Sequence, residues 1–199
     1  DIGPSLTTPD TKVVIYCQPL DKYAGKSELS VGFVSWRRLE DNMLPPRTKA
    51  TAAYLNSALA SLEAHQAGYD EGLFLTSNGH VCEGPGENVL IYKKGKLITP
   101  TASENILEGI TRDLVIRLGK EELGLEVEER SISRTELYAS DEVFFSGTAM
   151  EVTPIIEVDH RTVGAGKEGE LCKKIKELFF GLTVGKNPKY AEYCTPVYK

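Results

Sequence analysis

Lys49 is the residue of this chain whose type and surroundings first point to chemistry. It follows Pro45 and Pro46, and residues 50–67 after it are rich in alanine and leucine and free of glycine and proline. The prolines favour an extended approach and the following stretch predicts a helix, so we expect Lys49 at or just before the first helical turn. The helix dipole disfavours a charged amine there, and the neutral amine is the form that attacks a carbonyl. The alternative interpretation is an ordinary solvated lysine.

Two glycine-containing turns are candidate anion sites. Gly109-Ile110-Thr111 opens a second predicted helix, where unpaired N–H groups and the Thr111 hydroxyl can hold an anion. Ser146-Gly147-Thr148-Ala149 lies between two apolar runs, and a turn of small residues can direct backbone N–H groups into a concave nest. Each turn also has a plain structural interpretation, a helix N-cap in the first case and a tight strand connection in the second.

A carboxylate and a tyrosine complete the set of candidates. Glu83 precedes Gly84-Pro85-Gly86, whose glycines allow another group to approach closely, and Tyr54 follows Lys49 by five residues. An exposed loop acid and a core tyrosine are the alternative interpretations. An amine, two anion sites and a carboxylate are together what pyridoxal phosphate needs.

The elements that position these residues do not form a regular strand–helix alternation. Turn signals at Asn78-Gly79 and Lys94-Gly95 predict hairpins, and the pattern as a whole predicts a mixed α/β (α+β) domain. We expect strands at residues 12–17, 29–36, 71–76, 80–83, 89–92, 96–99, 126–132, 142–146 and 151–158, and helices at 50–67, 109–123, 134–138 and 171–180.

The amino-acid composition limits the classes of molecule that the protein is expected to bind. The 199 residues carry a net charge of −6 with acids and bases interspersed, which argues against nucleic acid or an anionic membrane as the main partner. No apolar run approaches the length of a membrane span. The four cysteines are widely spaced without a CxxC pair, so we expect free thiols, no metal site and a cytoplasmic location.

Four motifs, in order and spacing, resemble those of the class IV aminotransferases over about residues 31–181. They are Lys49-Ala-Thr-Ala-Ala-Tyr-Leu-Asn-Ser, Glu83-Gly-Pro-Gly-Glu-Asn, Leu107-Glu-Gly-Ile-Thr-Arg and Ser146-Gly-Thr-Ala-Met-Glu. The last motif looks most like that of the branched-chain amino acid aminotransferases. The resemblance implies the large domain of a fold type IV enzyme, with a mixed sheet or pseudo-barrel and flanking helices.

The resemblance also implies roles around a pyridoxal phosphate cofactor. Lys49 would bind the cofactor through a Schiff base and then move a proton between the substrate and the cofactor. Glu83 would pair with the pyridine nitrogen and Tyr54 with the phenolic oxygen, while Leu107 would lie against the ring face.

The two anion sites receive roles in the same way. Ile110, Thr111 and Thr148, with Gly147 in the same turn, would hold the phosphate. The backbone around Thr148 and Ala149 would also bind the substrate carboxylate.

Two residues near the end of the second predicted strand would contact the substrate. Trp36 would line the side-chain pocket, with a core tryptophan as the alternative, and Arg38 would lie at the rim of the active site. The resemblance further implies that residues 1–27 are an interdomain connection with the first strand and that 28–199 are the cofactor-binding domain. From the resemblance we expect that the small N-terminal domain of the family, with its phosphate-binding arginine, is absent from these 199 residues.

The implied activity is transamination between a branched-chain L-amino acid (leucine, isoleucine or valine) and 2-oxoglutarate, in a homodimer or higher homo-oligomer. Three alternatives stay open at this stage. Two are other chemistries on the same fold, D-amino acid transamination and the 4-amino-4-deoxychorismate lyase reaction. The third is a catalytically incomplete fragment that binds a ligand.

Overall fold

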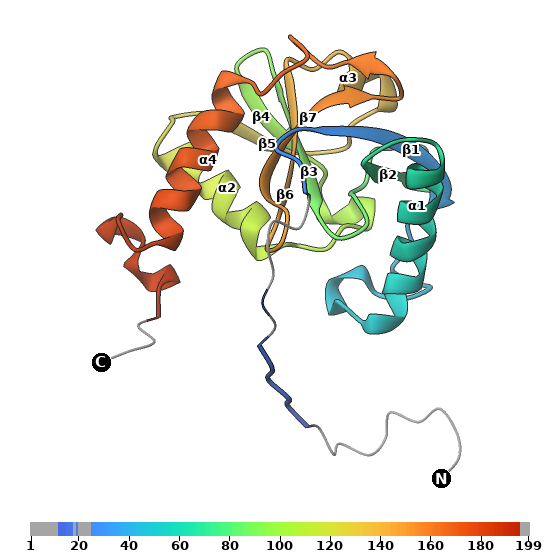
Figure 1. Ribbon diagram of the computed structural model, residues 1–199, viewed down its shortest axis with the longest axis horizontal. Helices are drawn as coiled ribbons and strands as arrows, with labels where there is room; N and C mark the ends of the chain where they lie inside the picture. The colour runs from blue at the N-terminus through green and yellow to red at the C-terminus, as the bar shows by residue number, and fades with distance from the viewer. Residues whose placement is uncertain (1–11, 18, 20–24, 196–199) are drawn as a thin grey trace.

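The computed structural model describes residues 12–17, 19 and 25–195, and its centre is one mixed sheet (Figure 1). The strands pair in the order β2-β1-β7-β6-β3-β4-β5, and β8 extends β7 as a short hairpin. This arrangement confirms the mixed α/β class. The strands are β1 (Leu29–Arg37), β2 (Glu71–Leu75), β3 (Asn88–Lys93), β4 (Lys96–Thr99), β5 (Glu126–Glu129), β6 (Glu142–Gly147), β7 (Glu151–Val158) and β8 (Arg161–Thr162).

Parallel and antiparallel pairs are both present. β1 runs parallel to β2 and to β7, and β4 runs parallel to β5. Parallel neighbours need a crossover, which α1 (Tyr54–Gln66) supplies between β1 and β2 and α2 (Ile110–Glu121) supplies between β4 and β5. The strands β3, β4, β6 and β7 form antiparallel pairs, including the expected turn at Lys94-Gly95.

The helices cover different parts of the sheet. α2 and α4 (Glu170–Thr183) contact each other and pack on β6 and β7, whereas α1 packs on β1 and β2 (Figure 1). Successive strand residues point to opposite faces, so Phe144 is buried with the α2–α4 side and Phe145 with the other side. The short α3 (Arg134–Tyr138) adds Leu137 to that second core.

Helix α1 lies on the sheet through small side chains. Its buried residues are Ser57, Ala60 and Ala64, and a Cβ built on Gly72 of β2 would lie 3.3 Å from the backbone oxygen of Ala60. The small residues therefore allow a close helix–strand approach. The larger side chains point outward, with Leu55 68% exposed and Leu62 54% exposed.

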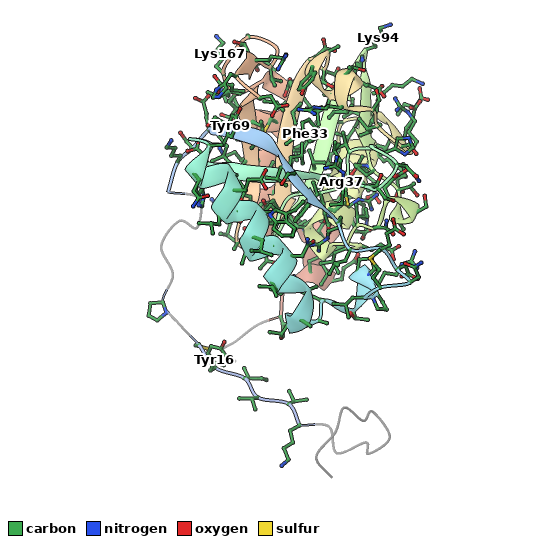
Figure 2. The ribbon with its side chains drawn as sticks, turned by 90° about the vertical axis from the view of Figure 1, so that its right-hand side faces the viewer. Tyr16, Phe33, Arg37, Tyr69, Lys94 and Lys167 are labelled. Carbon is green, nitrogen blue, oxygen red and sulfur yellow. The ribbon has the colours of Figure 1, made fainter. Side chains whose placement is uncertain are left out.

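Some expected elements differ in the structure. Residues 12–17 are not in a strand, and Tyr16 lies apart from the body of the domain (Figure 2). Their apolar side chains predict a strand only if a neighbouring strand pairs with them, and none of the described strands does. The arm at 80–83 forms only isolated bridges, and β5 ends at Glu129 instead of 132.

The helix after Lys49 also begins later than predicted. Residues Thr51–Ala53 form a 3₁₀ turn, η2, and α1 starts at Tyr54. Among the described residues, no helix is long and apolar enough to cross a membrane. The four cysteines are free thiols, and no cluster of metal-ligating side chains is found in the same part of the chain.

Candidate active site

Lys49 lies between two short 3₁₀ turns in a backbone conformation that side-chain-bearing residues rarely adopt. It ends η1 (Pro46–Thr48) with φ 49° and ψ 38°, in the left-handed region, and η2 follows after Ala50. The Thr48 hydroxyl donates a hydrogen bond of 2.8 Å to the backbone oxygen of Pro45. This conformation costs free energy, so the surrounding structure must hold the Lys49 backbone in place.

Two adjoining cavities meet at this lysine. One has a volume of about 30 Å³ and the other of about 280 Å³. Both are lined by Lys49, Gly86, Asn88 and Leu107, so they form one continuous site. The smaller cavity also reaches Arg38, Tyr54, Ser57, Glu83 and Glu87. The larger cavity also reaches Arg47, Glu108, Ile110, Thr111, Gly147 and Thr148.

Glu83 is a buried carboxylate fixed by several donors. Its Oε2 accepts hydrogen bonds from the backbone N–H of Leu107 at 2.9 Å and from Asn88 Nδ2 at 3.0 Å. The Nε of Arg38 lies 2.8 Å from Oε1 as an ion pair. Burial raises the pKa of the Glu83 carboxyl to about 7, although Arg38 and the Leu107 N–H oppose that rise.

Arg38 lies behind Glu83 and not at the solvent-facing rim. Its guanidinium packs 5.3 Å from the ring centroid of Phe74 and donates a 3.2 Å hydrogen bond to Ser57 Oγ. The sequence offered no signal for this position, because strand register at the end of β1 decides which of Arg37 and Arg38 turns inward. Trp36 is exposed and does not line either cavity, so its contribution to a substrate pocket stays a prediction.

The anion-binding end of the site is the start of α2. Gly109 is the N-cap and provides no side-chain hydrogen bond to the first turn, which leaves N–H groups there available. Thr111 is buried at the wall of the larger cavity, and Gly147 and Thr148 approach from the end of β6. Ala149 is exposed beside them and does not line the cavity.

Asn88 and Glu87 are site residues to which the family resemblance assigned no role. Asn88 Nδ2 donates to both Glu83 and the backbone oxygen of Leu107, so it joins the carboxylate to the loop before α2. Burial and the neighbouring Glu71 raise the pKa of Glu87 well above that of an ordinary carboxyl. Both residues lie in the quoted motif after Glu83, and that spacing was the available signal.

The site fits a phosphorylated carbonyl cofactor with a ring nitrogen. Glu83 Oε1 lies 2.8 Å from Arg38 Nε as an ion pair without hydrogen-bond geometry, so its lone pairs can also accept a hydrogen bond from a protonated ring nitrogen. An amine, Lys49, lies between this carboxylate and the uncapped helix start. The arrangement therefore offers a covalent anchor, a counter-charge and an anion cradle in one continuous cavity.

Comparison with known proteins defines the class. Residues 2–158 match the family model described as amino-transferase class IV, and the chain belongs to this family.

Particular relatives are branched-chain enzymes. A probable branched-chain-amino-acid aminotransferase of Aquifex aeolicus is 48% identical over 198 residues, which are 99% of this chain and 64% of the relative. The branched-chain-amino-acid aminotransferase of Escherichia coli K12 is 44% identical over 193 residues, 94% of this chain and 62% of the relative. The chain thus spans less than two thirds of the length of these curated relatives.

The solved structures that are similar to this chain include branched-chain aminotransferases as well. The branched-chain aminotransferase of Thermoproteus uzoniensis with norvaline has a TM-score of 0.87 and 46% identity, covering 91% of this chain and 60% of that one. The holo-form of the Thermobaculum terrenum branched-chain amino acid aminotransferase, solved with pyridoxal phosphate, has a TM-score of 0.87 and 43% identity, covering 92% and 60%. At this identity the likeness extends beyond the fold to the family, for which pyridoxal phosphate is the implied cofactor.

Proposed function

We propose that this chain carries the catalytic site of a pyridoxal phosphate-dependent aminotransferase that exchanges an amino group between a branched-chain L-amino acid and 2-oxoglutarate. Residues 28–199 are its cofactor-binding domain in this proposal. The observation that carries it is that Lys49 lies at both adjoining cavities, with Glu83 at the smaller and the start of α2 at the larger. The names of the relatives at 44–48% identity support the choice of substrate.

The cofactor, when bound, supplies a carbonyl that reacts with amines and a ring that accepts electrons. Lys49, as the neutral amine, would be the residue that holds that carbonyl covalently, with release of one water. Once a substrate amine has taken its place, the Lys49 amine would be the base that accepts the proton from the substrate Cα and later gives it back. Lys49 meets both cavities, so one amine serves the covalent step and the proton transfer.

Glu83 keeps the ring nitrogen protonated in this proposal. Its carboxyl is held close to its ionisation midpoint at neutral pH, with a pKa of about 7. A cation placed against Oε1 favours the ionised form of the carboxylate. Asn88 holds Oε2 and Arg38 pairs with Oε1, so the carboxylate is fixed in its orientation.

The remaining residues orient the two anions. The N–H groups of Ile110 and Thr111 at the start of α2, with the Thr111 and Thr148 hydroxyls, bind the phosphate. Tyr54 lies at the wall of the smaller cavity and donates to the phenolic oxygen of the cofactor. The backbone around Thr148 and Ala149 binds the substrate carboxylate.

The test is a titration with pyridoxal phosphate, followed by borohydride reduction, peptide mapping and a substrate comparison. We expect a visible absorption band, a reduced adduct on Lys49, and amino transfer from L-leucine to 2-oxoglutarate. Turnover of D-alanine or aminodeoxychorismate in preference to L-leucine would assign one of the other chemistries. An adduct on another lysine, or none, would leave a ligand-binding fragment without the proposed activity.

We also propose a homodimer in a reducing, cytoplasmic compartment. The outward leucines of α1, Leu55 and Leu62, provide apolar surface for a second copy, and the free cysteines suit such a compartment. Sedimentation of a Leu55→Glu, Leu62→Glu double variant should show the monomer mass where the parent shows the dimer. Gln66→Glu, a charge added at an exposed site on the same helix, is the matched control. Equal masses for the parent and the double variant would rule out this face of α1 as the dimer interface.

A further inference from the structure

An ion pair lies at the wall of the larger cavity. Arg47 Nε is 2.6 Å from Glu108 Oε2, and both side chains are 55% exposed. Arg47 belongs to η1, two residues before Lys49, and Glu108 directly precedes Gly109, the N-cap of α2. The pair thus joins the lysine turn to the anion-binding helix start.

The charged residues that line this cavity are not equally free to bind an anion. Among the residues that line it, the cations are Arg47 and Lys49 and the acid is Glu108. The Lys49 amine is consumed by the covalent bond in the proposed function. Arg47 is therefore the cation left to balance an anion at the start of α2.

The Arg47 guanidinium has donors to spare. Its hydrogen bond to Glu108 uses Nε, and the two terminal nitrogens have no partner within the described part of the chain. A guanidinium presents five N–H donors in a planar fork, so it can bond a carboxylate on one edge and a phosphate on another. Charge-assisted bonds of this kind are stronger than neutral ones.

We propose that Arg47 is a phosphate-binding residue of this site and that Glu108 balances its charge when no anion is bound. The proposal rests on the proposed function for the identity of the phosphate ligand. It adds to the phosphate site a cation from η1, the turn that the reactive lysine ends. Loss of Arg47 then weakens binding of the anion, while loss of the Glu108 charge strengthens it.

The opposite signs separate this role from a structural one. We would measure dissociation constants of the 199-residue chain and its variants for pyridoxal phosphate and for pyridoxal, which lacks the phosphate. Arg47→Gln should bind pyridoxal phosphate about tenfold more weakly and pyridoxal within about twofold of the parent. Glu108→Gln should bind pyridoxal phosphate more tightly than the parent. Lys94→Gln removes the same charge at the exposed β3–β4 turn and should change neither constant.

Other results would overturn the inference. If Arg47→Gln and Glu108→Gln weaken pyridoxal phosphate binding alike, or weaken pyridoxal equally, the ion pair is structural. A titration of inorganic phosphate followed by ³¹P line width needs no covalent bond and tests the anion site alone. Loss of that binding in Arg47→Gln would support the role of Arg47. The absence of an adduct on Lys49 would count against the proposed function alone. Unchanged phosphate binding in Arg47→Gln would reject the role of Arg47 in binding the phosphate.

Discussion

Arg38 and Glu83 form an ion pair almost entirely removed from water, with Nε 2.8 Å from Oε1 and side chains only 9% and 3% exposed. Burial nevertheless raises the pKa of Glu83 to about 7, so the nearby cation offsets the desolvation only in part. The protonation state of Glu83 therefore responds to its immediate surroundings. A ligand that binds next to Glu83 can therefore change the charge of this carboxylate.

Stability should fall as the pH rises through this range. The folded protein keeps a proton on Glu83 up to about pH 7, whereas an unperturbed carboxyl releases it near 4.5. The folded state binds more protons between these values, so the free energy of unfolding decreases by about 3 kcal/mol from pH 4.5 to 7 on account of this group. Urea unfolding at several pH values should show this slope in the parent and a shallower one in Glu83→Gln. Parallel slopes would contradict the assignment.

Phe74 should matter both to stability and to this titration. It is fully buried on β2 and lies under the Arg38 guanidinium. Phe74→Ala should cost about 3–5 kcal/mol of unfolding free energy and also shift the pH range of the slope, because Arg38 loses its support. Phe144→Ala is the matched control, since Phe144 is equally buried in the core beside α2 and α4. Its stability loss should be similar and its pH profile unshifted.

Gly109 should not tolerate a side chain. A Cβ at this position would overlap Asn88 Oδ1, and Asn88 joins Glu83 to the Leu107 backbone. Gly109→Ala should therefore weaken pyridoxal phosphate binding about tenfold by displacing Asn88. Gly181→Ala, in α4 with open space around it, should instead stabilise the protein by about 1 kcal/mol without affecting the cofactor. Fluorescence titration and thermal unfolding of both variants check the pair.

The backbone at Lys49 should show measurable strain. Its left-handed conformation is unfavourable for residues with a Cβ and free for glycine. Lys49→Gly should be about 1 kcal/mol more stable than Lys49→Ala, and neither variant should form a covalent adduct with pyridoxal phosphate. Equal stabilities would show that the turn relaxes when the amine is removed. Urea denaturation of the two variants makes the comparison.

Local patterns predicted most of the fold, because they depend on short-range chemistry. The Lys94-Gly95 turn, the Gly109 helix start and the strands expected at 142–146 and 151–158 were all confirmed. The motif residues lie together in the structure, with Lys49 at both adjoining cavities, Glu83 at the smaller and Thr111 at the larger.

The structure differs from the expectations where contacts between residues far apart in the sequence determine the local conformation. Residues 12–17 have strand composition but no described strand beside them. Arg38 became a partner of Glu83 because β1, β2 and the loop before α2 meet there, which spacing alone does not reveal. The Lys49 conformation and the Arg47–Glu108 pair likewise depend on how two loops approach each other.

The position of β1 in the sheet has a consequence for how the protein is made. On one side it pairs with β2, where Val31 lies opposite Glu71, and on the other with β7, where Leu29 lies opposite Ile155. During synthesis the β1–α1–β2 unit leaves the ribosome long before β7 exists, so one edge of β1 stays open to wrong partners. The segment that carries the reactive lysine thus emerges before β7, yet β1 reaches its final register only when that later strand arrives. Pairing over such a sequence distance makes this closure a slow step of folding.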